Sequence, residues 1–501
     1  MGIVREAAYT SVDLLRLMLG VSPIERTSES MASKQRGGGD PARYPHLEWY
    51  RGTSRQTCGL YPFVASSSTP MVGVPVGKAL DGTGTVCADP INWFETGLIS
   101  APSCMVLGLN GLGKSSLVRR MVIGLEAQGA HTMVLGDIKP DYRDVVEALG
   151  GQIIAIGHGR SGINPLDAGN AAQAAAALRE AGREDLAREV EQAAHERKKT
   201  LVCSLLHVIR RTPPTDREET IIDEAVRVLE DWGRPAKLSD LLDVVREAPE
   251  PLRLAALDRG DMARYRQIVE DLEASLTALL KGRFGAIFAA DKTVPMMTDR
   301  SVVFDVSSLL QADEDLQAAV LLASWSYGFA TVEVSQVLAD AGLAPRARYM
   351  LVMDELWRIL RTSPGMVERV DSLTRLNRTV GVGQMMITHT ISDFTALASE
   401  ADRKKAQGFI ERSKMLFIGG VPKKEIDELR RVFTFSDAEQ SLVSSWNAPG
   451  TYDPATGART APVGQGKFLL KTSDGPGFPF YMRFTPSEFR LSNTNQRWDM
   501  K

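Results

Sequence analysis

The chain has 501 residues, a length that accommodates about three structural units or one large α/β domain with an insertion. Its 59 Lys and Arg residues against 62 Asp and Glu residues give a formal net charge of −3, and 44% of the residues are hydrophobic. This composition excludes a wholly disordered chain and a surface that is basic throughout, so any contact with nucleic acid has to be local.

The spacing of the cysteines and the hydropathy of the chain indicate its cellular compartment. Cys58, Cys87, Cys104 and Cys203 are widely scattered and form no CxxC or CxH pair, which argues against a disulfide framework and a structural zinc site. No apolar stretch approaches the roughly 18 residues of a membrane-spanning helix. We expect a cytoplasmic protein that does not cross a membrane by itself, with a peripheral position on the inner face of the cell membrane left open.

Residues 1–45 are predicted to form a helix followed by a flexible linker. Residues 1–20 have the apolar spacing of an amphipathic helix, and residues 22–40 are rich in Ser, Arg and Gly. A docking or membrane-surface helix and a loosely attached terminus both fit this pattern, and the second is favoured.

Residues 46–167 are predicted to begin an α/β core. Short apolar runs broken by Gly and Pro come first, and strand and helix candidates then alternate. The candidates in chain order are strand 105–107, helix 117–125, strand 133–135, helix 142–149 and strand 153–156. Such alternation predicts a parallel sheet.

Residues 168–282 are predicted to be an all-α insertion, and residues 283–501 to complete the core. The segments with helical spacing and exposed charge are 171–177, 186–199, 218–232, 238–247 and 263–280. Sheet-like apolar runs return at 301–305, 349–353, 385–387 and 415–418.

The strongest chemical motif lies at residues 108–115, which fit GxxxxGK(S/T) at every fixed position between an apolar strand and a helix. Backbone N–H groups of such a loop encircle phosphate oxygens, and the helix start adds the positive end of its dipole. Lys114 would neutralise β/γ-phosphate charge and Ser115 would ligate Mg²⁺. The predicted nucleotide contacts are Gly108, Asn110, Gly111, Leu112, Gly113, Lys114, Ser115 and Ser116.

The strand candidate 349–353 runs directly into two carboxylates, Asp354 and Glu355. A buried parallel strand would deliver both to the carboxyl edge of the sheet, beside the phosphate loop. Asp354 is then a candidate for the Mg²⁺ shell, and Glu355 a candidate for polarising the attacking water. An acidic helix start is the alternative interpretation.

Four further motifs lie between the phosphate loop and Asp354. They are Gly136-Asp137-Ile138-Lys139-Pro140-Asp141-Tyr142, Gly150-Gly151, Ile163-Asn164-Pro165-Leu166-Asp167 and Gly282-Arg283-Phe284-Gly285. With the phosphate loop and the helical insertion, they resemble the VirB/TraC-type ATPases of type IV secretion, in the FtsK/HerA superfamily, over residues 62–489. The C-terminal segment is similar to that of actinobacterial members. The resemblance implies an α/β fold, with a RecA-like P-loop NTPase core, a mostly parallel sheet and an all-α insertion.

The resemblance also implies a function. The expected protein is a homo-hexameric motor that hydrolyses ATP with Mg²⁺ and energises conjugative DNA transfer or assembly of a secretion channel. Membrane-embedded channel components are the implied partners, with DNA or a relaxase–DNA complex left open. The alternatives are a HerA/FtsK-like DNA translocase or DNA-processing motor without a channel, and a non-hydrolytic scaffold, against which Lys114, Asp354 and Glu355 argue.

The family pattern points to three further candidates. Arg378 is in register with the family arginine and Arg412 precedes a strand candidate, so either is a candidate finger that reaches a neighbour's nucleotide. His389 occupies the position of the family's γ-phosphate-sensing glutamine, where an imidazole can still donate one hydrogen bond. A buried, satisfied histidine is the alternative for His389. Basic clusters such as 197–199 could line a surface that faces DNA, but solvated helix faces are the favoured interpretation.

Overall fold

The structure is a computed structural model that describes residues 70–80, 84–354, 360, 367, 381–392, 397, 399–451, 460–472 and 475–491. The chain divides into two units, Met1–Ala65 and Ser66–Lys501, and the described residues all belong to the second. The predicted N-terminal helix and linker, Glu355 and Arg378 lie outside the described residues.

One eleven-stranded sheet organises this unit, in the order β2-β1-β11-β10-β9-β3-β8-β7-β4-β6-β5. From β9 to β5 every neighbouring pair is parallel, and the strands from β2 to β10 join the β9 edge as antiparallel neighbours. The strands are β1 (Pro75–Ala79), β2 (Thr85–Cys87), β3 (Ser103–Leu107), β4 (Ala130–Asp137), β5 (Gln152–Ala155), β6 (Val302–Asp305), β7 (Arg348–Met353), β8 (Val382–Thr388), β9 (Met415–Ile418), β10 (Lys467–Thr472) and β11 (Phe478–Tyr481).

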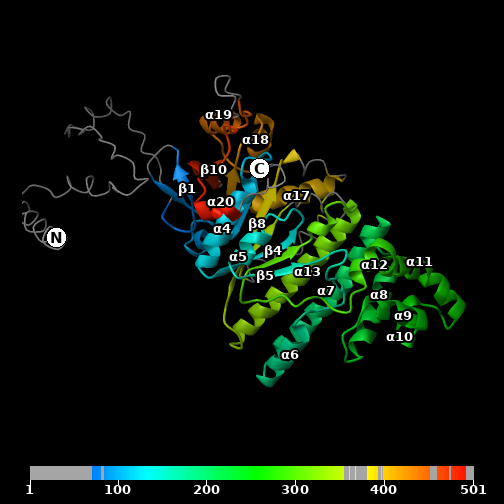
Figure 1. Ribbon diagram of the computed structural model, residues 1–501. Helices are drawn as coiled ribbons and strands as arrows, with labels where there is room; N and C mark the ends of the chain where they lie inside the picture. The colour runs from blue at the N-terminus through cyan, green and yellow to red at the C-terminus, as the bar shows by residue number, and fades with distance from the viewer. Residues whose placement is uncertain are drawn as a thin grey trace, which may run out of the picture. The chain divides into compact units, whose positions relative to one another are not determined.

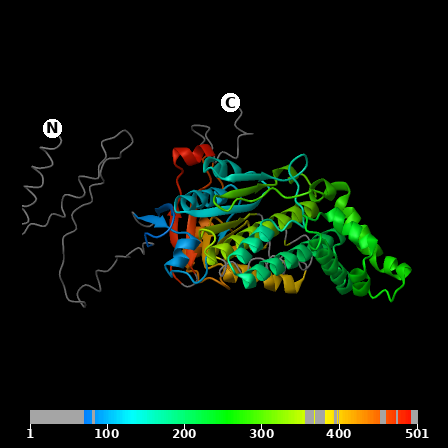
Figure 2. The ribbon, with the colours of Figure 1, turned by 90° about the horizontal axis from the view of Figure 1, so that it is seen from below.

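Helices cover both faces of the sheet (Figures 1 and 2). The helices are α3 (Pro90–Glu95), α4 (Lys114–Ala127), α5 (Arg143–Ala148), α6 (Ala171–Glu180), α7 (Glu184–Arg210), α8 (Asp216–Glu230), α9 (Leu238–Glu247), α10 (Glu250–Ala256), α11 (Met262–Leu280), α12 (Gly282–Phe288), α13 (Glu314–Asp340), α17 (Glu400–Arg412), α18 (Lys423–Leu429), α19 (Asp437–Ser445) and α20 (Pro486–Leu491). The run from α6 to α12 lies between β5 and β6 without an intervening strand, so the expected all-α insertion is confirmed.

The parallel strands are buried on both faces. Alternate residues of β3 belong to different cores: Met105 and Leu107 pack with α13 and the insertion, whereas Cys104 and Val106 pack with α4. A strand covered on both sides reads as a continuous apolar run rather than an alternating one. This is why the short apolar runs predicted from the sequence correspond to β3 through β9.

The longest addition to the predicted elements in the core is α13, a helix of 27 residues that packs on β4 and α7. Its residues from Leu316 to Val332 are all buried, so it has no polar face and no amphipathic signal. Gly136 of β4 permits the close approach, because a Cβ there would lie 2.1 Å from Leu321 Cδ2 of α13. Within the described residues, no helix is both long enough and apolar enough to cross a membrane.

Helix α20 is tied to the helix that follows the phosphate loop. Arg120 of α4 donates to both carboxylate oxygens of Glu488 at 2.6 Å, and the backbone N–H of Thr485 donates to the same carboxylate. Burial opposes ionisation, but the hydrogen bonds from Arg120 and Thr485 outweigh it and lower the pKa of Glu488.

We expect Glu488→Gln to lower the free energy of unfolding by about 1–3 kcal/mol at pH 7, because a charge-assisted pair is lost from a largely buried site. Because its folded-state pKa is lowered, ionised Glu488 stabilises the fold at pH values above its unfolded-state pKa of about 4.3. This stabilisation is lost as the pH falls through the folded-state pKa. Denaturant unfolding of wild type and variant should therefore converge below that pH. Glu400→Gln, which alters an exposed pair with Lys404, is the control and should change stability by no more than about 0.5 kcal/mol.

Candidate phosphate-binding and metal site

Three consecutive strands bring the main candidates to one edge of the sheet. Strand β8 lies between β3 and β7, with Leu107 beside Thr388 and Met353 beside Met386. The phosphate loop follows β3, His389 follows β8 and Asp354 follows β7, so all three emerge at the carboxyl edge. Neighbouring strands are about 4.8 Å apart, which separates β3 from β7 by roughly 10 Å.

The loop has the backbone that phosphate binding requires. Gly111 and Gly113 have φ of 79° and 103°, values that favour glycine, and Gly113 is the N-cap of α4. Lys114 is only 6% exposed, and its Nζ donates to the carbonyls of Gly108 at 2.6 Å and Leu109 at 3.2 Å. The lysine is therefore held against the loop, at the start of a helix whose first N–H groups are available to an anion.

The segments directly after β9 and directly before β10 hold the phosphate loop through backbone hydrogen bonds. The sequence interpretation missed these contacts. Leu109 N–H donates to the carbonyl of Gly420 at 3.1 Å, and Gly419 N–H donates to that of Leu107 at 2.7 Å. On the other side, Gly466 N–H donates to Leu112 at 2.9 Å. The signal for the first contact was the Gly-Gly pair directly after strand candidate 415–418.

Asp354 is held by a residue from the turn after β4. The Tyr142 hydroxyl donates to Asp354 Oδ2 at 2.8 Å, and the tyrosine is only 1% exposed. Burial, reinforced by the negative charges of Asp354 and Asp141, raises the pKa of Tyr142 well above its ordinary value. The hydroxyl therefore stays a donor and holds one carboxylate oxygen of Asp354.

Further along the same edge, Asp305 ends β6 and is fully buried. Arg143 and Arg160 approach its Oδ2 at 2.9 and 3.1 Å. Burial opposes ionisation, but hydrogen bonds from Ser307 and the two guanidinium charges lower the pKa of Asp305. The sequence interpretation did not single out this ionic cluster, because its members come from three separate segments.

Arg412 does not join this group. It ends α17 just before β9, and its carbonyl accepts from the hydroxyl of Ser103 at 2.5 Å, at the start of β3. The five residues of β3, spanning about 16 Å, separate that position from the phosphate loop. Arg412 therefore lies at the amino edge of the sheet, opposite the candidate site.

The loop that carries His389 is clamped by Glu425 of α18, a second element that the sequence interpretation missed. The buried Glu425 carboxylate accepts from Ile391 N–H at 2.6 Å, Ser392 N–H at 3.3 Å and the Ser392 hydroxyl at 2.5 Å. Since α18 follows Gly419 and Gly420, one short segment contacts both the phosphate loop and the His389 loop.

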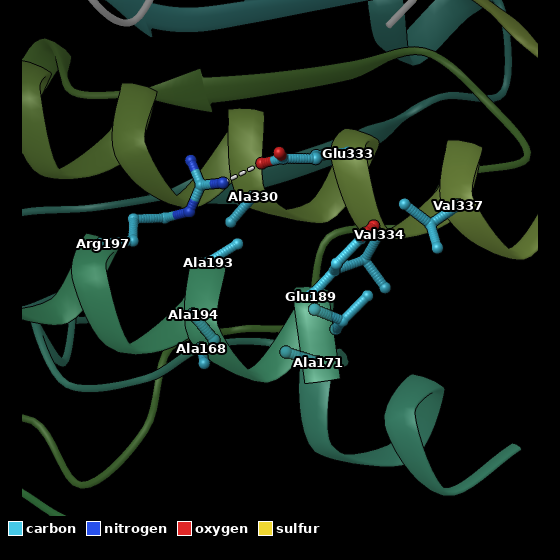
Figure 3. Close-up of a pocket in the computed structure, with 11 residues that line it drawn as sticks. Ala168, Ala171, Glu189, Ala193, Ala194, Arg197, Ala330, Glu333, Val334 and Val337 are labelled. Atoms are coloured by element: carbon cyan, nitrogen blue, oxygen red, sulfur yellow. Dashed lines mark hydrogen bonds and ion pairs between the residues drawn. The ribbon is translucent and has the colours of Figure 1, made fainter. Parts of the chain in front are cut away.

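The basic cluster 197–199 is engaged in ion pairs. Arg197 pairs with Glu333, Lys198 with Glu230 at 2.9 Å and Lys199 with Asp223 at 3.3 Å. Figure 3 shows Arg197 and Glu333 joined across a hollow of about 100 Å³ between α7 and α13, lined mostly by Ala and Val side chains. Its described lining residues include none from the phosphate loop, so this hollow is separate from the candidate site.

We expect Glu425→Ala to release the His389 loop, because two backbone N–H groups lose their carboxylate acceptor at a cost of about 1–3 kcal/mol. Amide hydrogen exchange at Ile391 and Ser392 should accelerate about tenfold or more. Glu439→Ala is the matched control, since Glu439 accepts from the Gly477 N–H elsewhere, and it should leave Ile391 and Ser392 unchanged. Equal exchange in wild type and Glu425→Ala would contradict the clamp.

No model of a known protein family matches the chain, and no curated protein matches it. Among solved structures, VirB4 of Thermoanaerobacter pseudethanolicus matches with a TM-score of 0.61 and 17% identity, over 85% of this chain and 100% of that chain. Plasmid coupling protein TrwB in complex with ADP and Mg²⁺ matches with a TM-score of 0.43 and 13% identity, over 77% and 86%. The expected fold class is confirmed: this chain has the RecA-like P-loop fold of VirB4, with a mostly parallel sheet and an all-α insertion.

Proposed function

We propose that the protein is an ATP-hydrolysing motor that energises conjugative DNA transfer or assembly of a type IV secretion channel. The proposal rests on one observation, made within a fold that is similar to that of VirB4. Strands β3, β8 and β7 end at a common edge, which carries the buried Lys114 on the phosphate loop and Asp354 two strands away. A HerA/FtsK-like translocase without a channel is the second candidate, and the likeness to VirB4 favours the first.

The residues present fit ATP and Mg²⁺. The positive-φ glycines and the start of α4 offer N–H donors to phosphate oxygens, and Lys114 supplies a cation at the same place. Ser115 and Asp354 supply the hydroxyl and carboxylate oxygens that Mg²⁺ prefers. When bound, Mg²⁺ would neutralise charge on the β- and γ-phosphates. Glu355, which lies outside the described residues, is assigned to orienting and polarising the attacking water.

The remaining assignments concern an assembly. We assign a homo-hexamer in which Arg378 or Arg412 reaches the nucleotide of a neighbouring subunit. Arg412 lies at the amino edge of the sheet, so a role for it at a nucleotide requires a neighbouring subunit. His389, which directly follows β8 between the loop and Asp354, is assigned to γ-phosphate sensing. Channel components, and DNA or a relaxase–DNA complex, are the proposed partners.

The organisation of the chain stays a prediction with the same boundaries. Residues 1–45 would form the helix and linker, 46–167 and 283–501 the ATPase core, and 168–282 the insertion. A position on the inner face of the cell membrane would follow from channel partners rather than from a spanning helix.

Lys114→Ala should largely abolish nucleotide binding, because the lysine neutralises charge in the ground state. Glu355→Gln should keep nucleotide affinity and block turnover, because the glutamate serves the water. Fluorescent-nucleotide binding and phosphate release measured on both variants separate these effects. Retained affinity in Lys114→Ala together with normal hydrolysis in Glu355→Gln would refute the assignment of the site.

Turnover per subunit should rise with protein concentration, because a trans arginine contributes about 10³- to 10⁵-fold in other NTPases. Mixing Glu355→Gln subunits with Arg412→Ala or Arg378→Ala subunits should restore hydrolysis at mixed interfaces, where one partner keeps the intact site and the other donates the arginine. Sedimentation run alongside the ATPase assay would establish co-assembly. Concentration-independent turnover by a demonstrated monomer would refute the shared site.

A further inference from the structure

The turn after β4 is held in a defined shape by one buried carboxylate. Asp137, only 2% exposed, accepts from the backbone N–H groups of Asp141 at 3.0 Å, Tyr142 at 2.9 Å and Arg143 at 3.3 Å. Burial raises the pKa of Asp137, although these hydrogen bonds from Tyr142 and Asp141 act in the opposite direction. The three contacts close the segment 137–143 into a turn and fix where the Tyr142 side chain begins.

This turn contacts Asp354 directly and is connected to Ser115 through Arg119. On one side, the Tyr142 hydroxyl donates to Asp354 Oδ2 at 2.8 Å. On the other side, the buried Arg119 of α4 donates to the carbonyl of Asp141 at 3.2 Å and to that of Ser115 at 3.3 Å. The same guanidinium lies 3.4 Å from the Ser116 hydroxyl. One turn thus links the start of α4, which follows β3, to the end of β7. Strands β3 and β7 are not neighbours in the sheet, since β8 lies between them.

We propose that the turn of residues 137–143 is a brace that fixes the separation of Ser115 and Asp354, with Tyr142 and Arg119 as its positioning residues. The proposal rests on the proposed function, since it concerns how those two residues would hold Mg²⁺. Donors that hydrogen-bond to a ligating carboxylate and orient it typically contribute about 10- to 100-fold to metal affinity. The brace gives a structural role to the segment Gly136–Tyr142, which the sequence suggested as a family motif.

Both positioning residues act through geometry rather than through contact with the phosphates. Tyr142 holds one oxygen of Asp354 and so restricts rotation of the carboxylate. Arg119 suits its role because its planar fork can donate to two carbonyls at once, whereas a lysine offers a point charge. Gly136, directly before the turn, packs closely against α13, which fixes the position at which the turn begins.

The test is Tyr142→Phe, which removes only the hydroxyl, with Tyr265→Phe as the matched control. Tyr265 is equally buried at 1% exposed, and its hydroxyl donates to the carbonyl of Val245 at 2.8 Å within the insertion. Mn²⁺ binding to the full-length, ADP-saturated protein is measured by electron paramagnetic resonance of free Mn²⁺. ADP affinity is measured separately in EDTA.

We expect Tyr142→Phe to weaken Mn²⁺ binding about tenfold or more, with ADP affinity in EDTA unchanged and turnover recovering at saturating Mg²⁺. Tyr265→Phe should leave all three quantities unchanged. In an Asp354→Asn background, Tyr142→Phe should have no further effect on Mn²⁺ binding. Should Tyr142→Phe fail to fold, Arg119→Lys carries the same expectation for Mn²⁺ and ADP.

The outcomes separate the two levels of the proposal. A wild-type protein that binds neither ADP nor Mn²⁺ would refute the proposed function together with the brace. Wild-type binding of both ligands, with Mn²⁺ affinity unchanged in Tyr142→Phe and Arg119→Lys, would overturn the brace alone. An equal loss of Mn²⁺ affinity with and without Asp354→Asn would also overturn it, because the hydroxyl would then act elsewhere.

Discussion

Burial of the parallel strands on both faces is the constraint on which the candidate site depends. Every residue of β3 is buried, with alternate side chains in two separate cores. The charged groups of the candidate site lie where these strands end, because a buried charge without partners is costly. Parallel strands end together at one edge, and this brings the loop after β3, His389 and Asp354 onto three consecutive strands.

The loops at this edge support one another through hydrogen bonds rather than through apolar packing alone. The phosphate loop is bound to Gly420 and Gly466, the His389 loop to Glu425, and Asp354 to Tyr142. Each contact joins segments that are far apart in the sequence. Hydrogen bonds thus connect the phosphate loop to the segment before α18, and Asp354 to the turn after β4.

The insertion is attached to the core by a polar joint. The Asn164 amide donates to the carbonyls of Ala236 and Asp291, and the Asp167 carboxylate accepts from the N–H of Thr293. The segment 163–167, which the sequence suggested as a family motif, thus ties the exit from the core to the point of return. Helices α8 to α11 extend from this joint away from β1 and β10 (Figures 1 and 2).

The sequence by itself determined the phosphate loop, Asp354 at a strand end and the strands from β3 to β9, because these depend on local backbone chemistry and on runs of apolar residues. It did not reveal α13, whose side chains are buried all round and carry no helical period, nor the antiparallel β10 and β11. Only the tertiary structure decided which strand ends meet, that Arg412 lies at the opposite edge, and that Tyr142, Arg119 and Glu425 hold the site. The contact between Tyr142 and Asp354 spans 212 residues and that between Ser103 and Arg412 spans 309. Such contacts depend on strand order, which the spacing of apolar residues along a chain does not encode.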